Sequence, residues 1–239
     1  NTTTVSPPRL SWSQVSTYQQ CPAKHYLSRR FKAEFTPSAL HFGKAVHHAL
    51  AAFYTARLEG CTIALDELFD TFRTAWAAPT EAPLRFGKGE TDETHVEMAQ
   101  RMFEAFLTGV QPGEIVAVEQ SFAVEVMPGL LVTGIADLVE VKDSCFWIVD
   151  HKTSRNAPSD AYDREQALLY RIGLEALGLI PDGAEACLRY DILRKLKTRG
   201  EFTSVRVEVT SKDEDDLRHK LIAISEAIEQ RIVYRVRSW

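Results

Sequence analysis

The chain has 239 residues, of which 45% are apolar and 26% are charged, and its formal net charge is −5. This balance is typical of a folded globular protein and excludes a disordered chain, and the negative charge excludes an overall basic coat for nucleic-acid binding. No apolar run approaches the roughly 20 residues of a membrane helix, and the first residues lack the blocks of a signal peptide. The four cysteines include no C-x-x-C pair, so we expect a cytoplasmic protein without the disulfide framework of a secreted domain.

The first half of the chain shows the apolar spacing of helices. Residues 13–27 predict a short helix that is interrupted at Cys21-Pro22. Thr36-Pro37 predicts the start of a longer helix, with a hydroxyl N-cap followed by proline, which continues to about Gly60. Residues 66–76 and 91–107 predict two more helices. Residues 78–89, which contain two prolines and two glycines, predict a loop between them.

From Glu114 the apolar period changes to two, which predicts strands. Residues 115–126, 130–141 and 145–150 predict an antiparallel meander, and the third of these strands is apolar enough to be central. Residues 158–178 predict a helix, residues 187–193 and 202–210 two strands, and residues 211–235 a long helix. The order indicates a mixed α/β fold, with a helical region over residues 1–110 and a sheet-containing core over residues 111–239.

Carboxylates end two neighbouring strands of this meander. Asp137 closes one strand, and Asp150 and Lys152 end the next. Because side chains alternate along a strand, Asp150 and Lys152 share a face, and Asp137 could face Asp150 from an adjacent strand about 5 Å away. Two carboxylates beside an ammonium are typical of a site that holds Mg²⁺ or Mn²⁺ and stabilises charge on a phosphate. The alternative is an exposed salt bridge, but the apolar central strand before the motif favours the site.

These residues resemble the signature of the PD-(D/E)XK nucleases, in the RecB-like exonuclease branch. Gly43-Lys44-Ala45-Val46-His47 is similar to a helical motif whose histidine ligates metal, and Gln166-Ala167-Leu168-Leu169-Tyr170 is similar to the Q-x-x-x-Y motif that follows the catalytic lysine. Residues 13–22 resemble the opening segment of that branch, which ends in Cys-Pro. The motifs occur in the family's order over nearly the whole chain, although Ala136 stands where the superfamily name has proline.

The resemblance implies a restriction-endonuclease-like mixed sheet flanked by helices. It implies four metal ligands, which are His47, Asp137, Asp150 and the backbone carbonyl of His151. It implies catalytic roles for Asp137, Asp150, Lys152, Gln166 and Tyr170. In this interpretation Gln166 positions Lys152 or its water and Tyr170 contacts the substrate backbone; packing with a capping amide is the alternative for this pair.

The residues around His47 fit either a site or a core. His47 lies near the apolar face of its helix, where a histidine is more often a hydrogen-bonded core residue than a ligand. Gly43, one turn earlier, would let another backbone come close, which favours a site. His48 is expected to face solvent.

Basic residues cluster twice despite the negative net charge. Lys24, Arg29 and Arg30 lie among aromatic residues, and a second group surrounds Arg194 and Lys195 and includes Arg189. Cations that bind phosphates next to rings that stack on bases are typical of a groove for single-stranded DNA. We therefore expect nucleic-acid contacts from these five residues, with solvated charged faces as the alternative: Lys24, Arg29, Arg30, Arg194 and Lys195.

Together the motifs predict a metal-dependent DNA exonuclease in DNA repair, recombination or CRISPR-type DNA processing, with DNA and other proteins of those pathways as partners. One alternative is a catalytically silent nuclease-fold module that binds DNA or acts as a scaffold. Another is a metal hydrolase of small phosphorylated substrates. A zinc peptidase is disfavoured, because His47-His48 lacks the H-E-x-x-H pattern.

Relatives in this branch often join their chain ends through a [4Fe–4S] cluster, which needs four thiolates. The resemblance implies that one comes from a Cys-Pro segment such as Cys21-Pro22, and three from a run after the last helix. Cys61, Cys145 and Cys187 are scattered along the chain, so we expect a cluster only with a cysteine-rich tail that these 239 residues lack. The alternative is that Cys21 is a lone thiol.

Overall fold

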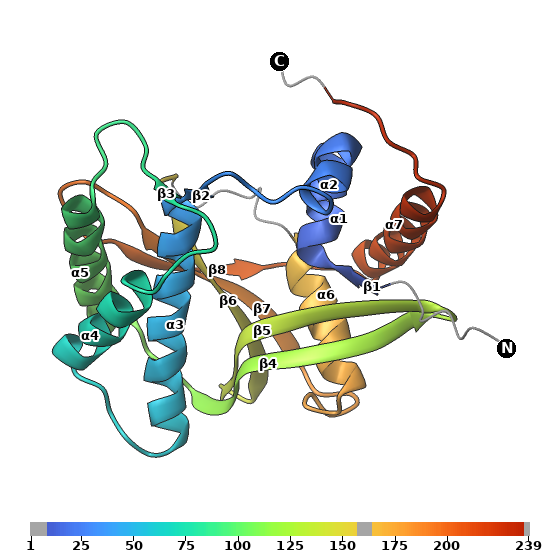
Figure 1. Cartoon of the computed structure of the whole chain (residues 1–239). Helices are drawn as coiled ribbons and strands as arrows, with labels where there is room; N and C mark the ends of the chain where they lie inside the picture. Colours follow the sequence, from blue (N-terminus) through green and yellow to red (C-terminus); the bar gives the residue numbers. More distant parts are fainter. Residues whose placement is uncertain (1–8, 157–163, 237–239) are drawn as a thin grey trace, which may run out of the picture.

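The computed structural model describes residues 9–156 and 164–236 (Figure 1). The N-terminal elements are β1 (Arg9–Ser11), α1 (Trp12–Gln20), α2 (Pro22–Ser28), β2 (Thr36–Pro37), α3 (Ser38–Leu58), α4 (Leu65–Trp76), β3 (Leu84–Arg85) and α5 (Asp92–Gly109). The remaining elements are β4 (Glu114–Met127), β5 (Leu130–Lys142), β6 (Cys145–Ser154), α6 (Arg164–Ala176), β7 (Ala186–Arg194), β8 (Phe202–Val207) and α7 (Ser211–Glu229).

The main sheet has the order β1-β5-β6-β7-β8, and β4 also pairs with β5. The pairs β4–β5, β5–β6 and β7–β8 are antiparallel, whereas β6–β7 and β1–β5 are parallel. The predicted meander is thus present, and its third strand, β6, lies inside the sheet. The predicted mixed α/β fold is confirmed.

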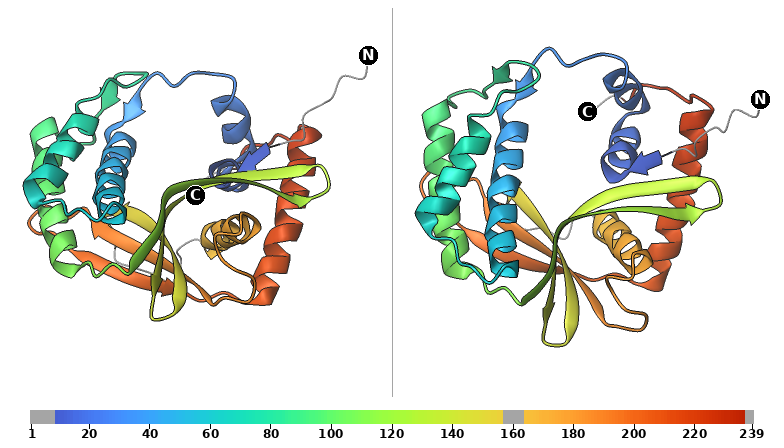
Figure 2. Two further views of the ribbon diagram at one scale, coloured as in Figure 1. Left: turned by 90° about the horizontal axis from the view of Figure 1, so that it is seen from below. Right: turned by 60° about the horizontal axis from the view of Figure 1, so that its bottom comes forward.

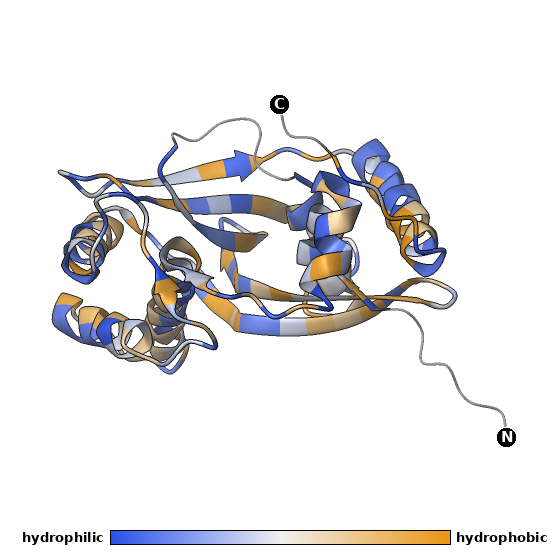
Figure 3. Cartoon of the chain, turned by 45° about the horizontal axis from the view of Figure 1, so that its top comes forward, coloured by the Kyte–Doolittle hydropathy of each residue, from blue (hydrophilic) through white to orange (hydrophobic). Residues whose placement is uncertain are grey.

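Helices cover both faces of this sheet. One apolar cluster joins α1, α6 and α7 to residues such as Val139 and Ile148, and the other joins α3, α4 and α5 to Leu138 and Val149. Neighbouring residues of one strand thus enter different cores, as the alternation of side chains requires. Figure 2 shows α3, α4 and α5 gathered at one end and α6 and α7 at the other. The hydropathy colours accordingly change from residue to residue along the strands (Figure 3).

Several predicted boundaries are wrong, and one of them is the end of β6, which continues to Ser154 instead of stopping at residue 150. Thr36-Pro37 does not cap α3 but forms β2, because the Thr36 amide donates to the Pro83 carbonyl (2.9 Å) and β2 pairs with β3, inside the predicted loop. β8 ends at Val207 instead of Thr210. The last helix ends at Glu229 instead of Arg235, because the following segment bonds to α1 and α2 instead of continuing the helix. The predicted start of the helix at Pro158 lies outside the described residues, and within them no helix is long and apolar enough to cross a membrane.

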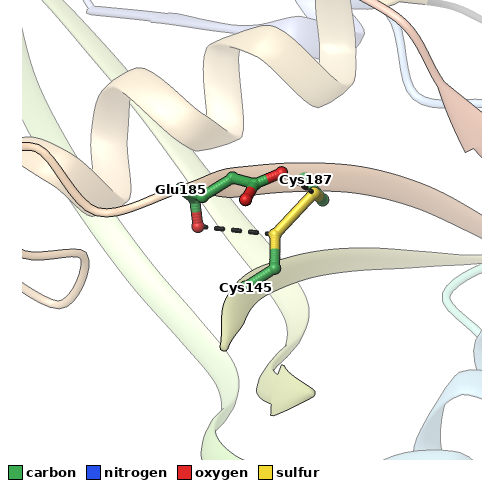
Figure 4. A group of neighbouring side chains, drawn as sticks. All are labelled: Cys145, Glu185 and Cys187. Atoms are coloured by element: carbon green, nitrogen blue, oxygen red, sulfur yellow. Dashed lines mark hydrogen bonds between the residues drawn. A yellow bond between two sulfur atoms is a disulfide. The ribbon is translucent and has the colours of Figure 1, made fainter. Parts of the chain in front are cut away.

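One disulfide joins Cys145 to Cys187, whose Cα atoms are 6.5 Å apart (Figure 4). The sequence pattern does not predict this cysteine pair, because the two residues lie on different predicted strands. The two cysteines meet because β6 and β7 are parallel neighbours in which Trp147 pairs with Cys187. Cys145, two residues before Trp147 on the same face, is therefore diagonally adjacent to Cys187.

Candidate active site

The candidate site lies where one edge of β5 changes partner. Residues 131–133 of β5 pair with β1, and residues 138–142 pair with β6. Residues 134–137 lie between these two pairings, and Asp137 is the last of them. The last pair of β5 and β6 is Leu138 with Val149, so Asp137 and Asp150 are the next residues on the two strands. Continuing this register by one residue places Asp137 opposite Asp150, as expected from the sequence.

Asp137 is held by nitrogen groups of two elements. The backbone amide of His151 donates to its Oδ2 (2.7 Å), and Nδ1 of His47 and of His151 lie 3.3 and 3.6 Å from the same oxygen. Burial favours the neutral acid, but hydrogen bonds and charge from both histidines outweigh it and hold the pKa of Asp137 well below its usual value. Burial likewise opposes charge on His47, and the hydrogen bond and charge of Asp137 raise the pKa of His47 above its ordinary value. Asp137 is therefore an ionised carboxylate in contact with imidazole.

Asp150 and Lys152 form the second part of the site. The Asp150 carboxylate is almost completely buried, and its Oδ2 lies 2.7 Å from Nζ of Lys152. Burial raises the pKa of Asp150 to about 6, although the charge of Lys152 opposes this and that of Asp137 adds to it. Both side chains lie on one face of β6, as the alternation predicts.

Lys152 connects this pair to α6. Its Nζ donates to Oε1 of Gln166 (2.9 Å), and Nε2 of Gln166 donates to the hydroxyl oxygen of Tyr170 (2.8 Å). Nζ also lies 5.3 Å from the centre of the Tyr190 ring. Burial and the charge of Asp150 raise the pKa of Tyr170, so its hydroxyl keeps its proton. The structure thus brings together all five residues that the resemblance marks as catalytic.

Glu119 of β4 belongs to the same cluster, although it was not among the site residues expected from the sequence. One ligand atom each of His47, Glu119 and Asp137 lies within 4.8 Å of the others. The β4–β5 register places Glu119 opposite Asp137, and its φ of 48° is in the left-handed region, which is uncommon outside glycine. A signal was present, because a hairpin centred on Pro128 brings positions 119 and 137 face to face.

The donor set fits a hard divalent cation. Carboxylate oxygens and one imidazole are ligands that Mg²⁺ and Mn²⁺ accept. The Asp150 carboxylate is buried with the Lys152 ammonium as its neighbour, and His47, Glu119 and Asp137 already place one ligand atom each within 4.8 Å of the others. The residues present therefore fit a metal beside Asp137 and Asp150.

The helix α3 positions His47 but not for the steric reason that the sequence suggested. A Cβ atom on Gly43 would lie 3.5 Å from Oγ1 of Thr153, which is ordinary contact with a side chain. Gly43 is therefore not required for close approach of a backbone. His48 is exposed, as expected.

The cationic residues differ in how they lie relative to this site. Lys195 lines a cavity of about 630 Å³ together with His47, Glu119 and Thr153. Lys24 lines another, which contains Gln166 and Tyr170. By contrast, Arg194 pairs with Glu201 (2.8 Å). Arg189 is held by Glu140 and Asp191, so Arg189 is not available as a DNA contact.

Arg29 and Arg30 lie at a separate pocket, formed by α1, α2 and the segment after α7. Arg30 packs over the Tyr26 ring, with its guanidinium carbon 4.2 Å from the ring centre. The structure does not bring these two arginines into the cluster around Asp137.

Cys21 lies at the junction of α1 and α2, beside the C-terminal segment. Its Sγ is 4.0 Å from the Tyr234 carbonyl oxygen, and the Ala23 amide donates to the same oxygen (3.1 Å). The Tyr18 hydroxyl donates to the Ile232 carbonyl (2.8 Å). The two ends of the described chain are thus side by side, and among the described residues Cys21 and Cys61 are the free cysteines.

Comparisons with known proteins give a family and a fold. The family model of the PD-(D/E)XK nuclease superfamily matches residues 9–238. The fold is similar to that of a crystal structure from Eubacterium rectale, whose name describes the protein as a proposed exonuclease. The TM-score is 0.56 and the identity 14%, over 96% of this chain and 84% of that one. The crystal structure of SSO0001 is less similar, with a TM-score of 0.31 and 11% identity over 89% of this chain and 85% of that one. No curated protein matches the sequence.

Proposed function

Because the chain belongs to the PD-(D/E)XK nuclease superfamily, we propose that it is a metal-dependent deoxyribonuclease that degrades DNA from its ends. The observation that carries the proposal is the meeting of Asp137, Asp150 and Lys152 at the edge of β5, with His47 beside them. Repair, recombination or CRISPR-type DNA processing, with protein partners of those pathways, is the setting in which we place this activity.

In this proposal, His47, Glu119 and Asp137 hold Mg²⁺ or Mn²⁺, together with Asp150 and the backbone carbonyl of His151. Three of these groups already have ligand atoms within 4.8 Å of one another. When bound, such a cation acidifies water and neutralises phosphate charge. A [4Fe–4S] cluster at Cys21 would be a structural addition and would need three further thiolates.

Lys152 is the cation that stabilises charge on the scissile phosphate. Its ammonium is held between Asp150 and Gln166, and within the described ranges these two groups take two of its three N–H groups, which leaves the third to donate to a phosphate oxygen or a water. The Tyr170 hydroxyl accepts from Gln166 and keeps its own proton. That proton is available to donate to the substrate backbone.

DNA contacts come from the cations that lie at the cavities beside the cluster. Lys195 and Lys24 line the two cavities that adjoin it. Arg29, Arg30 and Arg194 are proposed as peripheral phosphate contacts, which strengthen binding without positioning the scissile bond.

Action at DNA ends is tested with linear and covalently closed circular DNA of one sequence, each incubated with Mg²⁺, with Mn²⁺ or with a chelator. We expect metal-dependent loss of the linear DNA while the circle persists. His47→Ala should abolish the loss, whereas His219→Ala, which removes an exposed imidazole on α7, should not. Rapid cutting of closed circles contradicts action from ends, and full activity of His47→Ala contradicts its ligand role.

A further inference from the structure

A second cavity adjoins Gln166 and Tyr170, whereas His47 lines the other cavity. It has a volume of about 850 Å³ and lies between α1 and α2 on one wall and β4, β5 and α6 on the other. Its β5 wall includes Thr133, Gly134 and Ile135, the region where β1 ends its pairing and β6 has not begun its own. We call this cavity the α1 groove.

The lining of the α1 groove is chemically selective. None of the described residues that line it is acidic, in a chain with 33 Asp and Glu residues. One face of α1 contributes Ser13, Ser16, Thr17 and Gln20, and α2 contributes Lys24. These residues recur at three and four positions, so they form one polar line along the helix. Hydroxyls, an amide and an ammonium without carboxylates favour a polyanion.

The opposite face of α1 explains why this line faces the groove instead of the core. Trp12, Val15 and Tyr18 are buried in the core that α1 shares with α6 and α7. The helix is therefore anchored by its apolar side, and its polar side makes local hydrogen bonds, from Thr17 Oγ1 to the Ser13 carbonyl (2.7 Å) and from Lys24 Nζ to Gln20 Oε1 (3.5 Å). Ser13 and Gln20 are both exposed.

The α1 groove extends to the hydrogen-bonded residues of α6 that hold Lys152. Gln166 and Tyr170 line it, and Gln166 accepts a hydrogen bond from Lys152. A chain that lies in the groove therefore reaches Gln166, the side chain that accepts from the Lys152 ammonium. From Ser13 to Gln20 the helix rises about 10 Å, which is roughly three nucleotides of one DNA strand.

Resting on the function proposed above, we propose that the α1 groove binds the backbone of one DNA strand next to the scissile phosphate. Hydroxyl and amide groups of α1 donate to its phosphates, and Lys24 pairs with one of them. Ile135 is half exposed within the groove and offers an apolar contact to unpaired bases, whose faces a duplex hides. The substrate strand at this subsite is therefore single.

Two neighbouring glutamines of α1 provide a matched test. Gln20 lines the groove, whereas Gln19 is exposed on the same helix outside it. Binding of a fluorescent oligothymidine is measured by anisotropy in a chelator, so that no strand is cleaved. We expect Gln20→Glu to weaken binding by about tenfold through repulsion of a phosphate and Gln19→Glu to bind like the wild type. Equal affinities of the two variants, with native circular dichroism, overturn the proposal.

Salt dependence gives a second readout. Lys24→Gln should lower the slope of log affinity against log salt by about 0.7, as expected for one phosphate contact to a single strand. Lys212→Gln, at an exposed position on α7, should leave the slope unchanged. An unchanged slope in Lys24→Gln contradicts the phosphate contact, and equal competition by a blunt duplex contradicts a single-stranded subsite.

The binding test separates this inference from the proposed function. Wild-type protein that binds the oligothymidine through Gln20 but releases no nucleotides with metal would refute the nuclease and leave the groove assignment standing. Protein that degrades DNA with equal affinities in both glutamine variants would refute the groove alone.

Discussion

Replacing Asp150 by asparagine should stabilise the metal-free protein while it abolishes catalysis. Asp150 is almost completely buried, and burial raises its pKa to about 6 from an ordinary value near 3.9. At pH 7.5 the folded protein therefore contains a carboxylate that would be more stable in water. Asparagine has nearly the same shape as the protonated acid and no charge to bury.

The size of the effect follows from the shift. About two pH units at 1.36 kcal/mol each give about 3 kcal/mol at pH 7.5. Because the pKa is raised on folding, the stability that Asp150 contributes is fully present below about pH 4 and is lost as the pH rises through about 6. The advantage of Asp150→Asn should accordingly vanish in acid.

Urea unfolding in a chelator at pH 7.5 and at pH 4 measures this difference. Asp143→Asn is the matched control, because Asp143 is exposed in the β5–β6 turn with φ 52°, where asparagine is well tolerated. Added Mn²⁺ should stabilise the wild type but not Asp150→Asn. A variant that is less stable than the wild type at pH 7.5 without metal would refute the argument that the buried charge is costly.

Three further outcomes are expected. Reducing the Cys145–Cys187 disulfide, or replacing both cysteines by serine, should lower the free energy of unfolding by about 4 kcal/mol, because the bond closes a loop with a sequence separation of 42; an unchanged urea midpoint under reducing conditions would contradict this. Gly113→Ala should cost about 2 kcal/mol in urea unfolding, since its Cβ would lie 2.2 Å from the Val141 carbonyl oxygen, whereas Gly43→Ala should be neutral or stabilising by up to about 1 kcal/mol; equal costs would refute the packing argument. Glu119→Gln should weaken Mn²⁺ binding in calorimetry by about tenfold, and an unchanged affinity would remove Glu119 from the ligand set.

Hydrophobic period alone predicts the main helices and the meander, because these elements bury one side. It does not predict β1, whose three residues are too few to show a period and which depends on parallel pairing to β5. It extends the last helix too far, because Ile232 and Tyr234 bond to residues more than 200 positions earlier. Contacts between residues so far apart form only in the folded chain, so a local sequence pattern does not predict them.

The residues of the candidate site also differ in whether the sequence predicts them. Asp150 and Lys152 share a face by strand alternation, and the register places Asp137 opposite, so the spacing of the residues is informative there. Glu119 stands in no motif of the resemblance and reaches Asp137 only through the register of β4 with β5. Arg189 belongs to a basic cluster in the sequence, but in the structure it is paired with the buried carboxylates of Glu140 and Asp191. The sequence pattern does not predict these pairs, because the partners come from other parts of the chain or of the strand.

The most direct test of the central claim is the release of nucleotides from end-labelled linear single-stranded DNA by purified protein. Wild-type protein is compared with Lys152→Met and with Lys212→Met, which removes an exposed lysine on α7. We predict release of nucleotides only with Mg²⁺ or Mn²⁺, no release by Lys152→Met although this variant still binds the strand, and release at the wild-type rate by Lys212→Met. Release by Lys152→Met at the wild-type rate, or release that persists in a chelator, would contradict it.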